Sequence, residues 1–496
     1  MTTDSYSVAM TKECDRVLRG HLLRRDRQED LCFALWNLSR GSSRTTALIS
    51  KVIFPREGER SVHGNVSFNP GYFERALSEA NAADAGLALL HSHPDGRGWQ
   101  NMSRDDINAE CGNAGRVFGA TKLPFVGLTM AGDGSWSGRF WMRTAPRTYE
   151  RMDCGLVRVV GDVFGLHYYD GLLPAPKSTK AQIRTVASWG KKRQADLARL
   201  RVGIVGAGSV GGLIGEALAR TGFEDVKVID FDHIEEHNLD RLVYAERSNV
   251  GNLKATTLAD RLQSVATGSN FHCEPVSVAV YEEEGFRKAL DCDILLSCVD
   301  RPWGRHVLNL IAYAHLIPVI DGGIAVQTKS NGELRRADWR AHTCAPGQAC
   351  MACLGQYSTG LVQTEREGLL DDPKYIEGLP AGHPLKAREN VFAFSMSCAS
   401  FQMMQLLNYA LAPLGLAGPR PQMYHFVGGF LEKAEQIECE PDCAFREIVA
   451  KGDNCRYYVV GTRPSTKFEI KENDRLADHN PSPFRRFIKW LSRLLT

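Results

Sequence analysis

The chain has 496 residues, a length that favours two or three domains. Its composition, 43% apolar and 24% charged, is that of a soluble globular protein, and a net charge of +2 argues against a broad nucleic-acid surface. We find no signal peptide and no apolar run as long as a membrane span, and 14 cysteines are too sparse for a disulfide scaffold. Several cysteines are spaced like metal ligands, so we expect a cytoplasmic protein without membrane association.

Within residues 1–150, apolar strands alternate with helical stretches, as is typical of an α/β domain. The helices are expected at 70–85 and 103–119. The strands are expected at 86–90, 125–130 and 136–142, the last two joined by a turn at Gly132-Asp133-Gly134.

A candidate metal site follows the strand at 86–90. His91 and His93 lie two residues apart, and such residues face the same way on a strand, so both imidazoles can converge on one ion. After a proline and a glycine-rich turn, Ser103 begins a helix whose first turn supplies the Asp106 carboxylate. Three such ligands leave a fourth zinc position for water, which is typical of a catalytic site. An isolated His-x-His pair usually binds no metal; the Ser-x-x-Asp continuation favours the metal.

This pattern, His-x-His-Pro and then Ser-x-x-Asp, resembles the motif of the JAMM (JAB/MPN) zinc isopeptidases. The interval between His93 and Ser103 is slightly longer than is usual in that family. The resemblance implies a JAMM/MPN-type, cytidine-deaminase-like α/β domain over residues 1–150. It also implies that zinc binds His91, His93 and Asp106, and that Ser103 donates a hydrogen bond to the developing oxyanion.

The same family takes its general base from an earlier element. Residues 28–35 resemble the family's first strand, in which a glutamate runs into apolar residues, and this identifies Glu29. A zinc-bound water has a lowered pKa, and Glu29 would take its proton and pass it to the leaving amine. Alternatives stay open: Glu29 could be a solvated charge beside Asp30, or Glu57 or Glu59 could be the base, although both lie in a loop flanked by proline and glycine.

A linker is expected over residues 151–180, and a second domain over 181–465. The residues that mark the linker are Pro174, Pro176, Lys177 and Ser178. The second domain opens with an apolar strand that enters a glycine-rich turn and then a helix. The glycines of this turn are Gly206, Gly208 and Gly211. Glycines allow close approach of phosphates, and a helix N-terminus favours their negative charge.

Asp230 ends the next apolar strand, where it could bind a ribose, so the glycine turn alone fits an NAD-binding fold equally well. The run 230–241, with Asp-x-Asp and then Asn-Leu-x-Arg, is not expected of a dehydrogenase. It resembles the signature of the ThiF family, the adenylating enzymes that activate ubiquitin-like proteins and sulfur carriers. Residues 251–255 match that family's Gly-x-x-Lys, and Cys298-Val299-Asp300 its magnesium-site strand end.

The ThiF resemblance implies a Rossmann-like adenylation domain that uses ATP and Mg²⁺. Adenylation brings a carboxylate to the α-phosphate, and two anions meet only with cations and a metal present. The implied roles are ribose binding by Asp230, triphosphate contacts by Asn238, Arg241 and Lys254, magnesium positioning by Asp300, and reach across a homodimer interface by Arg184. Taken singly, Arg241 and Lys254 could be surface charges and Asp300 a helix cap; their occurrence together and in order favours the site.

Cys350 and Cys353 form half of a four-thiolate zinc site, by their spacing. Cys439 and Cys443 are available as the second half, and Cys455 follows them. The resemblance implies a structural zinc ion here; a catalytic role for Cys350 or Cys353 is the less favoured alternative.

Ubiquitin-activating relatives that form a thioester carry a cysteine before the helix expected at 390–410, whereas residues 371–389 contain none. Cys398 falls inside that helix, where we expect it to be packed. We therefore expect activation to stop at the acyl-adenylate. Ser358, Thr359 and Ser395 are conceivable sites of an oxyester intermediate.

The last segment, 466–496, is a basic amphipathic tail. Its apolar helical face comprises Phe484, Phe487, Ile488, Leu491, Leu494 and Leu495. We expect this tail to dock on the protein itself rather than on a membrane surface.

Together the two resemblances predict a bifunctional enzyme of a bacterial ubiquitin-like pathway, an activating enzyme fused to a deconjugase. It would adenylate a ubiquitin-like protein, process or release that protein with the isopeptidase, act with a conjugating enzyme and serve in antiphage defence. The alternative is activation and trimming of a sulfur carrier in cofactor or metabolite biosynthesis. A third possibility is a scaffold without enzymatic activity, against which the complete motifs in both halves argue.

Overall fold

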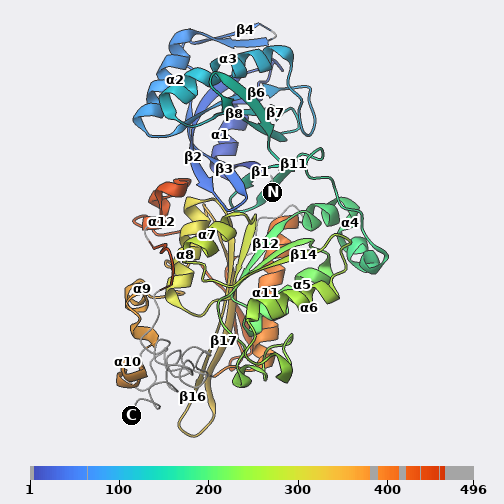
Figure 1. Ribbon diagram of the computed structural model, residues 1–496, viewed down its shortest axis with the longest axis vertical. Coiled ribbons are helices and arrows are strands. Elements are labelled where there is room, and N and C mark those ends of the chain that lie inside the picture. Colours follow the sequence, from blue (N-terminus) through green and yellow to red (C-terminus); the bar gives the residue numbers. More distant parts are fainter. Residues whose placement is uncertain are drawn as a thin grey trace, which may run out of the picture.

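The computed structural model describes residues 5–63, 65–371, 373–379, 389–412, 420–435, 437–456 and 458–463. The predicted tail at 466–496 lies outside the described residues. Among the helices of the described residues, none combines the length and apolar character needed to cross a membrane. The described chain forms two large sheets with helices, one above the other in Figure 1, and a small two-stranded sheet.

The N-terminal unit is built on a nine-stranded sheet in the order β11-β10-β1-β3-β2-β6-β7-β8-β9. Its strands are β1 (Ser5–Thr11), β2 (Leu31–Arg40), β3 (Arg44–Ile53), β6 (Gly86–His93), β7 (Phe125–Ala131), β8 (Trp136–Ala145), β9 (Thr148–Asp153), β10 (Leu156–Val160) and β11 (Phe164–Tyr168). Its helices are α1 (Lys12–Leu22), α2 (Pro70–Ala82) and α3 (Arg104–Thr121), and a separate hairpin joins β4 (Arg60–His63) to β5 (Asn65–Phe68). The predicted helices and strands of this half are therefore confirmed.

Strand β2 shows how the sequence places helices on both faces of this sheet. Leu31, Phe33 and Leu35 share a buried cluster with α2 and α3, whereas Cys32 and Ala34 lie in the cluster that contains residues of α1. Successive side chains of a strand point to opposite faces, so a continuous apolar run requires cover on both sides. The result is a three-layered α/β unit.

The predicted linker is wrong for residues 156–168. These residues form β10 and β11: β10 pairs in parallel with β1, and β11 pairs antiparallel with β10. The N-terminal unit therefore extends beyond residue 150, and Tyr168 ends its last strand. The reason is long-range pairing, because β10 forms hydrogen bonds with β1, which lies at the other end of the unit's sequence.

The C-terminal unit carries an eight-stranded sheet in the order β14-β13-β12-β15-β16-β17-β18-β19. Its strands are β12 (Arg201–Val205), β13 (Asp225–Ile229), β14 (His272–Val276), β15 (Ile294–Ser297), β16 (Val319–Thr328), β17 (Leu334–Cys344), β18 (Gln422–His425) and β19 (Phe430–Lys433). The main helices are α4 (Ile183–Ala198), α5 (Ser209–Thr221), α6 (Lys254–Val265), α7 (Glu283–Leu290), α8 (Pro302–Ala314), α9 (Thr359–Arg366), α10 (Pro373–Gly378), α11 (Phe392–Leu411) and α12 (Ala444–Glu447). Strands β12 to β16 pair in parallel, and β17 to β19 extend the sheet antiparallel.

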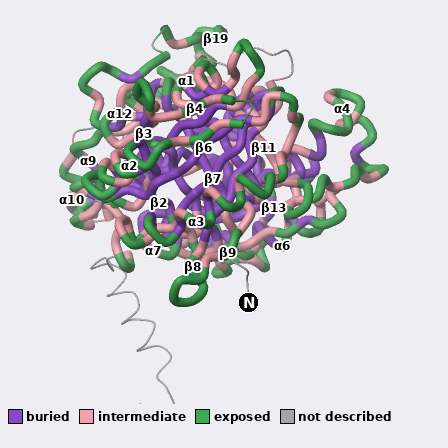
Figure 2. The backbone as a smooth tube through the Cα atoms, turned by 90° about the horizontal axis from the view of Figure 1, so that it is seen from above, coloured by how far each residue is buried: buried purple, intermediate pink, exposed green. Residues whose placement is uncertain are grey.

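The two units share a core. One buried cluster joins Leu48, Val160 and Phe164 of the first unit to residues of β12 and α11, and Phe164 stacks on Tyr409 with ring centroids 5.3 Å apart. Figure 2 shows buried backbone continuing through the centre of the molecule. The shared core means that the two units are packed together rather than joined only by a flexible chain.

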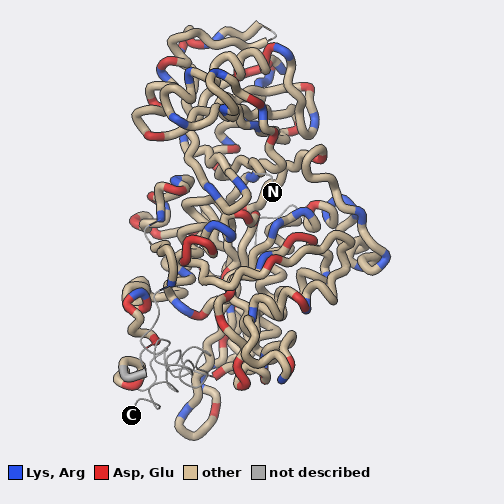
Figure 3. Tube along the Cα trace, viewed as in Figure 1, with Lys and Arg blue, Asp and Glu red and all other residues tan. Residues whose placement is uncertain are grey.

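A buried ion cluster reinforces this contact. Arg158 of β10 donates to Asp293 at 2.8 Å, and Arg44 of β3 pairs with the same carboxylate. Arg44 also donates to the carbonyl of Leu290 at 3.0 Å. All three charged side chains are almost completely buried. Elsewhere, basic and acidic positions are interspersed over both units (Figure 3).

Candidate functional site

The two histidines and the aspartate predicted as metal ligands meet where β6 ends and α3 begins. The Nε2 atoms of His91 and His93 are 3.2 Å apart, and each lies 3.4 Å from an oxygen of Asp106. All three candidate donor atoms lie within 4.8 Å of one another. Two imidazole nitrogens and one carboxylate oxygen at this spacing fit the donor set of a three-ligand zinc site with an open position.

Ser103 and Asp106 are held by a reciprocal capping box at the start of α3. The Ser103 amide donates to Asp106 at 2.8 Å, and the Asp106 amide donates to Ser103 Oγ at 3.1 Å. Because Ser103 Oγ accepts this bond, its hydroxyl proton can be donated to another group. Burial would raise the pKa of Asp106, but hydrogen bonds with both imidazoles lower it below the ordinary range.

Glu29 lies two residues before the start of β2 and is half-buried beside the same cluster. Burial raises the pKa of Glu29 and the Asp106 charge adds to the rise, while the His93 and His91 imidazoles oppose it. Two hydrogen bonds join its neighbour Asp30 to Ser92 of β6, the strand that carries His91 and His93. The Ser92 amide donates to the Asp30 carbonyl at 3.1 Å, and the Asp30 amide donates to Ser92 Oγ at 3.0 Å.

The Asp30 side chain is itself held by an ion pair with Arg60. It is almost fully buried and accepts two hydrogen bonds from Arg60 of β4, at 2.7 and 2.9 Å. The rival base Glu59 is engaged elsewhere, because Arg75 donates to it at 2.9 Å and lowers its pKa to about 2. The geometry therefore favours Glu29 over Glu59 as the carboxylate beside the metal ligands.

The second candidate site is the glycine turn between β12 and α5. Gly206 has a φ of 98°, and a Cβ there would lie 2.6 Å from the Cys298 carbonyl oxygen. A Cβ on Gly211 would lie 1.9 Å from the Gly206 carbonyl oxygen, and Gly208 is the N-cap of α5. Only glycines fit this close approach, which leaves the backbone and the α5 N-terminus open to phosphates.

Asp230, Asp232 and Lys254 lie together beside this turn. The Ala207 amide of the turn donates to Asp230 at 2.6 Å, and the Asp232 amide donates to the other Asp230 oxygen at 2.8 Å. Lys254 Nζ is 2.9 Å from Asp232. Burial raises the pKa of Asp230 to about 6; the Asp232 charge adds to the rise and Lys254 opposes it. Asp232 was not among the predicted site residues, although the Asp-x-Asp pattern contains it.

The remaining predicted nucleotide residues are more loosely placed. Buried Asn238 accepts from the Glu235 amide at 3.1 Å, and Arg241 donates to the His237 carbonyl at 2.7 Å, so both brace the loop after β13. Asp300 is exposed just after β15, where the chain runs into α8. Arg184 is exposed in the first turn of α4, a helix at the edge of the unit in Figure 1.

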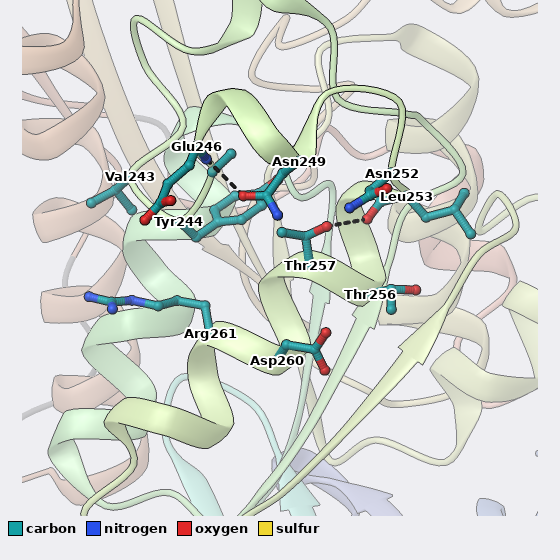
Figure 4. A pocket seen from close by; sticks show the side chains of 11 residues that line it. Val243, Tyr244, Glu246, Asn249, Asn252, Leu253, Thr256, Thr257, Asp260 and Arg261 are labelled. Atoms are coloured by element: carbon teal, nitrogen blue, oxygen red, sulfur yellow. Dashed lines mark hydrogen bonds between the residues drawn. The ribbon is translucent and has the colours of Figure 1, made fainter.

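A pocket of about 580 Å³ lies next to this loop, between it and α6 (Figure 4). Its lining residues are Val243, Tyr244, Ala245, Glu246, Asn249, Asn252, Leu253, Thr256, Thr257, Asp260 and Arg261. The hydroxyl of Tyr244 donates to the Ala207 carbonyl at 2.6 Å, so one wall of the pocket supports the glycine turn from behind.

The four cysteines predicted as zinc ligands converge from two distant segments. The Sγ atoms of Cys350 and Cys443 are 3.7 Å apart, the Cys350 amide donates to Cys439 at 3.2 Å, and the Cys353 amide donates to Cys350 at 3.3 Å. All four sulfurs lie within 4.8 Å of one another, and none of the described cysteines forms a disulfide. This donor set fits a closed, structural zinc site.

The possible acyl acceptors occupy different surroundings. Cys398 is fully buried in α11, where burial raises the pKa of its thiol to about 12. Ser395 is also buried, and its hydroxyl donates to Ser209 at the start of α5, 3.0 Å away. Ser358 and Thr359 are exposed at the start of α9. A thiolate nucleophile at Cys398 is therefore disfavoured by its environment.

Comparison with known proteins finds similarity in the C-terminal unit. Residues 179–413 match the model of the ThiF family, and the described strands of this segment form a Rossmann-like α/β sheet. An adenylyltransferase and sulfurtransferase from Meyerozyma guilliermondii is 30% identical over 129 residues, which are 26% of this chain and 30% of that protein. The molybdopterin-synthase adenylyltransferase of Escherichia coli is 26% identical over 156 residues, 32% of this chain and 59% of that protein.

These matches are partial, because the chain spans less than two thirds of the length of each of these relatives. The SAMP-activating enzyme E1 of Haloferax volcanii is 27% identical over 165 residues, covering 33% of this chain and 57% of that protein. Among solved structures, E. coli MccB with ATP is 15% identical with a TM-score of 0.41, covering 55% of this chain and 76% of that chain.

Proposed function

We propose that the chain adenylates the C-terminal carboxylate of a ubiquitin-like protein. The observation that carries this proposal is the cluster of the glycine turn, Asp230, Asp232 and Lys254 within a ThiF-family domain. Such clusters at the carboxyl ends of parallel strands are where open α/β sheets bind nucleotides. Names of relatives, among them a SAMP-activating enzyme E1, support a small protein as the substrate.

The residues divide the work of the reaction between them. Asp230 holds the ribose, the amides at the start of α5 donate hydrogen bonds to a phosphate, and Asn238, Arg241 and Lys254 contact the triphosphate. A carboxylate oxygen of the substrate bonds to the α-phosphorus, the bond to the bridging oxygen breaks, and pyrophosphate leaves with the electron pair. Magnesium, when bound near Asp300, would offset the negative charge of the phosphates. Arg184 would act across the interface of a homodimer.

The test is ATP–pyrophosphate exchange by the full chain with a ubiquitin-like protein that ends in glycine. Wild type should exchange, and Asp300→Ala should lower the exchange rate by about 100-fold, as for loss of an electrostatic contact in a transition state. Exchange at the wild-type rate would exclude Asp300 from the site. Absence of exchange in the wild type would overturn the proposed activity.

We further propose that activation ends at the acyl-adenylate. Burial of Cys398 supports this, because a thiol in apolar surroundings with a raised pKa is a poor nucleophile. An oxyester on Ser358, Thr359 or Ser395 is the alternative. Mass spectrometry of the chain after reaction with ATP and the ubiquitin-like protein separates these outcomes, since a thiol-sensitive adduct on a cysteine would contradict the adenylate-only pathway.

For the N-terminal unit we propose a second activity, zinc-dependent isopeptidase cleavage of the same ubiquitin-like protein. The convergence of His91, His93 and Asp106, with Glu29 beside them, supports it. Zinc bound there would supply a water of lowered pKa. Glu29 would accept a proton from this water and pass it to the leaving amine, and the Ser103 hydroxyl would donate a hydrogen bond to the oxyanion.

Cleavage of a linear fusion, in which the ubiquitin-like protein is followed by a reporter, tests this second activity. Activity should disappear with a chelator and return when Zn²⁺ is added back. Cleavage that survives full removal of zinc would contradict the metal-dependent mechanism.

We place both activities in the cytoplasm of a bacterium, in a conjugation pathway with a conjugating enzyme and a role in antiphage defence. The opposite direction of the two reactions, one activating and one releasing, supports a pathway that both attaches and removes its modifier. Relatives with sulfurtransferase and molybdopterin-synthase names support the alternative, activation and trimming of a sulfur carrier. An adjacent conjugating-enzyme gene favours the first pathway, and an adjacent cysteine desulfurase gene the second.

A further inference from the structure

Two carboxylates from another segment contact the residues that directly follow Asp300, the magnesium-site residue of the proposed adenylation reaction. Asp300 and Arg301 lie between β15 and α8, and α8 begins at Pro302. The N-cap residue Arg301 makes no side-chain capping bond to this helix. The first amides of a helix lack partners within the helix, so a buried helix start needs an acceptor from elsewhere.

Glu365 of α9 supplies that acceptor. The amide of Trp303, in the first turn of α8, donates to Glu365 Oε2 at 2.7 Å. Glu365 is only 5% exposed, and glutamate is rarely buried to this extent. Burial raises the pKa of Glu365 to about 7; the Trp303 amide and the Arg301 charge oppose the rise, and the charges of Asp371 and Asp300 add to it.

Asp371 holds the residue next to Asp300. Its carboxylate lies 2.6 Å from the Arg301 guanidinium, and it belongs to the short helix Leu369–Asp371 that follows α9. Arg301 and Trp303 are therefore both tied to the segment 359–371. The Trp303 ring adds a third restraint, because it stacks on Tyr281 with centroids 3.7 Å apart.

The chain leading into α9 is tied to α8 as well. Arg305 donates to the Gln356 carbonyl at 2.9 Å, and the His306 Nδ1 atom lies 3.0 Å from the Tyr357 hydroxyl. Asn309 accepts from the Met351 amide, which lies between the two cysteines of the first zinc pair, at 3.2 Å. The cysteine cluster, α9 and the start of α8 thus form one connected unit.

We propose that Glu365 and Asp371 are positioning residues that fix the Asp300 loop for its role at the nucleotide. The inference rests on the proposed adenylation activity and on Asp300 as its magnesium-site residue. Loss of the Glu365 cap would free the first turn of α8 and loosen the residues just before it, so that Asp300 would no longer be held in one position for binding magnesium. The bond from Trp303 needs only an acceptor oxygen, so a glutamine can replace Glu365.

The experiment measures ATP binding to the full chain by calorimetry at a series of Mg²⁺ concentrations, without any protein substrate. Wild type should bind ATP more tightly as Mg²⁺ rises, and Asp300→Ala should lose this enhancement. Glu365→Leu should raise the half-saturating Mg²⁺ concentration by about 10-fold, through loss of a helix cap. Glu365→Gln should stay within about twofold of wild type, because its amide oxygen still accepts the Trp303 bond.

Two further variants serve as a control and as a second test of the positioning role. Glu367→Leu changes an exposed carboxylate one residue beyond the end of the same helix and should leave the Mg²⁺ dependence unchanged. Asp371→Asn keeps an acceptor for Arg301 but removes the charge, and should shift the half-saturating Mg²⁺ by about threefold. If Glu365→Leu does not fold, the comparison of Asp371→Asn with Glu367→Leu decides the matter.

The outcomes are distinguishable. A wild type that does not bind ATP overturns the proposed adenylation activity itself. Loss of the Mg²⁺ effect in Asp300→Ala, with wild-type Mg²⁺ dependence in both Glu365→Leu and Asp371→Asn, overturns the positioning role and leaves the activity standing. Equal weakening of ATP binding at every Mg²⁺ concentration also overturns it, since that result indicates a general loss of structure.

Discussion

The two candidate sites are assembled in different ways. In the N-terminal unit, the metal ligands come from one short stretch in which a strand ends at His93 and the next helix begins after Ser103. In the C-terminal unit, the glycine turn, Asp230, Lys254 and Asp300 follow separate strands or begin separate helices. The first site is shaped by local geometry: side chains alternate along β6, and a capping box starts α3. The second site forms only when parallel strands lie side by side.

This difference shows which contacts each site depends on. The histidines and Asp106 need little beyond β6 and α3, but their base Glu29 is brought in through the bonds between Asp30 and Ser92. The nucleotide site depends on the position of the strand ends in the C-terminal sheet. Buried contacts with the N-terminal unit are made at the start of β12 and β15, the two strands that lead to this site. Asp293, which pairs with Arg44 and Arg158, directly precedes β15.

The largest expected effect is on the locally built site. Glu29→Gln should lower the rate of isopeptidase cleavage by about 10³-fold, because the amide cannot accept the proton of the attacking water. Zinc content should stay at the wild-type level, measured by atomic absorption. Glu59→Gln is the matched control, since Glu59 pairs with Arg75, and should cleave at a near wild-type rate. Equal losses in the two variants would contradict the assignment of the base.

The contact between the two units is tested at Asp293. Asp293→Ala leaves the buried guanidinium groups of Arg44 and Arg158 without their carboxylate, which should lower the free energy of unfolding by about 3–5 kcal/mol. Urea denaturation followed by tryptophan fluorescence measures this value. Glu13→Gln, at an exposed pair with Arg16, should leave stability unchanged. Two separate transitions in the wild type would argue against one cooperative unit.

The two candidate zinc sites can be told apart by a ligand change in the cysteine cluster. Cys353→Ser should weaken zinc binding at that cluster by on the order of 10²-fold, because a hydroxyl is a poor zinc ligand. Zinc content after dialysis should fall from about two ions per chain to about one. Cleavage at the histidine site should continue. A loss of cleavage together with the cysteine zinc would indicate that the two sites are coupled.

The smallest expected effect is on the link between the base and the metal-site strand. Asp30→Asn keeps the backbone bonds to Ser92 but weakens the anchoring by Arg60, and should lower the rate constant for cleavage by about 10-fold at unchanged zinc content. Single-turnover cleavage kinetics measure the rate constant. Wild-type kinetics would mean that the backbone bonds alone position Glu29.

The sequence contained the information for much of both sites because their residues follow short-range rules. Residues 86–90 were apolar and bounded by a proline, and they form β6 as expected; the helix expected at 103–119 begins after its Ser103 cap and spans Arg104–Thr121. Glycines at 206 and 211 could be chosen because a tight turn before a helix needs them. The cysteine pairs could be recognised by spacing, although their meeting depends on the fold.

The tertiary structure alone decided the contacts between distant segments. The strands at 156–168 lie in the predicted linker, and nothing local could show that β1 would pair with them. Arg44 and Asp293 look like ordinary charges in the sequence, and their burial follows from how the two units pack. Glu365 has no local signature either, because a carboxylate on a short helix becomes a cap only when another helix begins against it. Hydrogen-bond partners and burial are properties of the folded chain, whereas motif spacing is a property of the sequence.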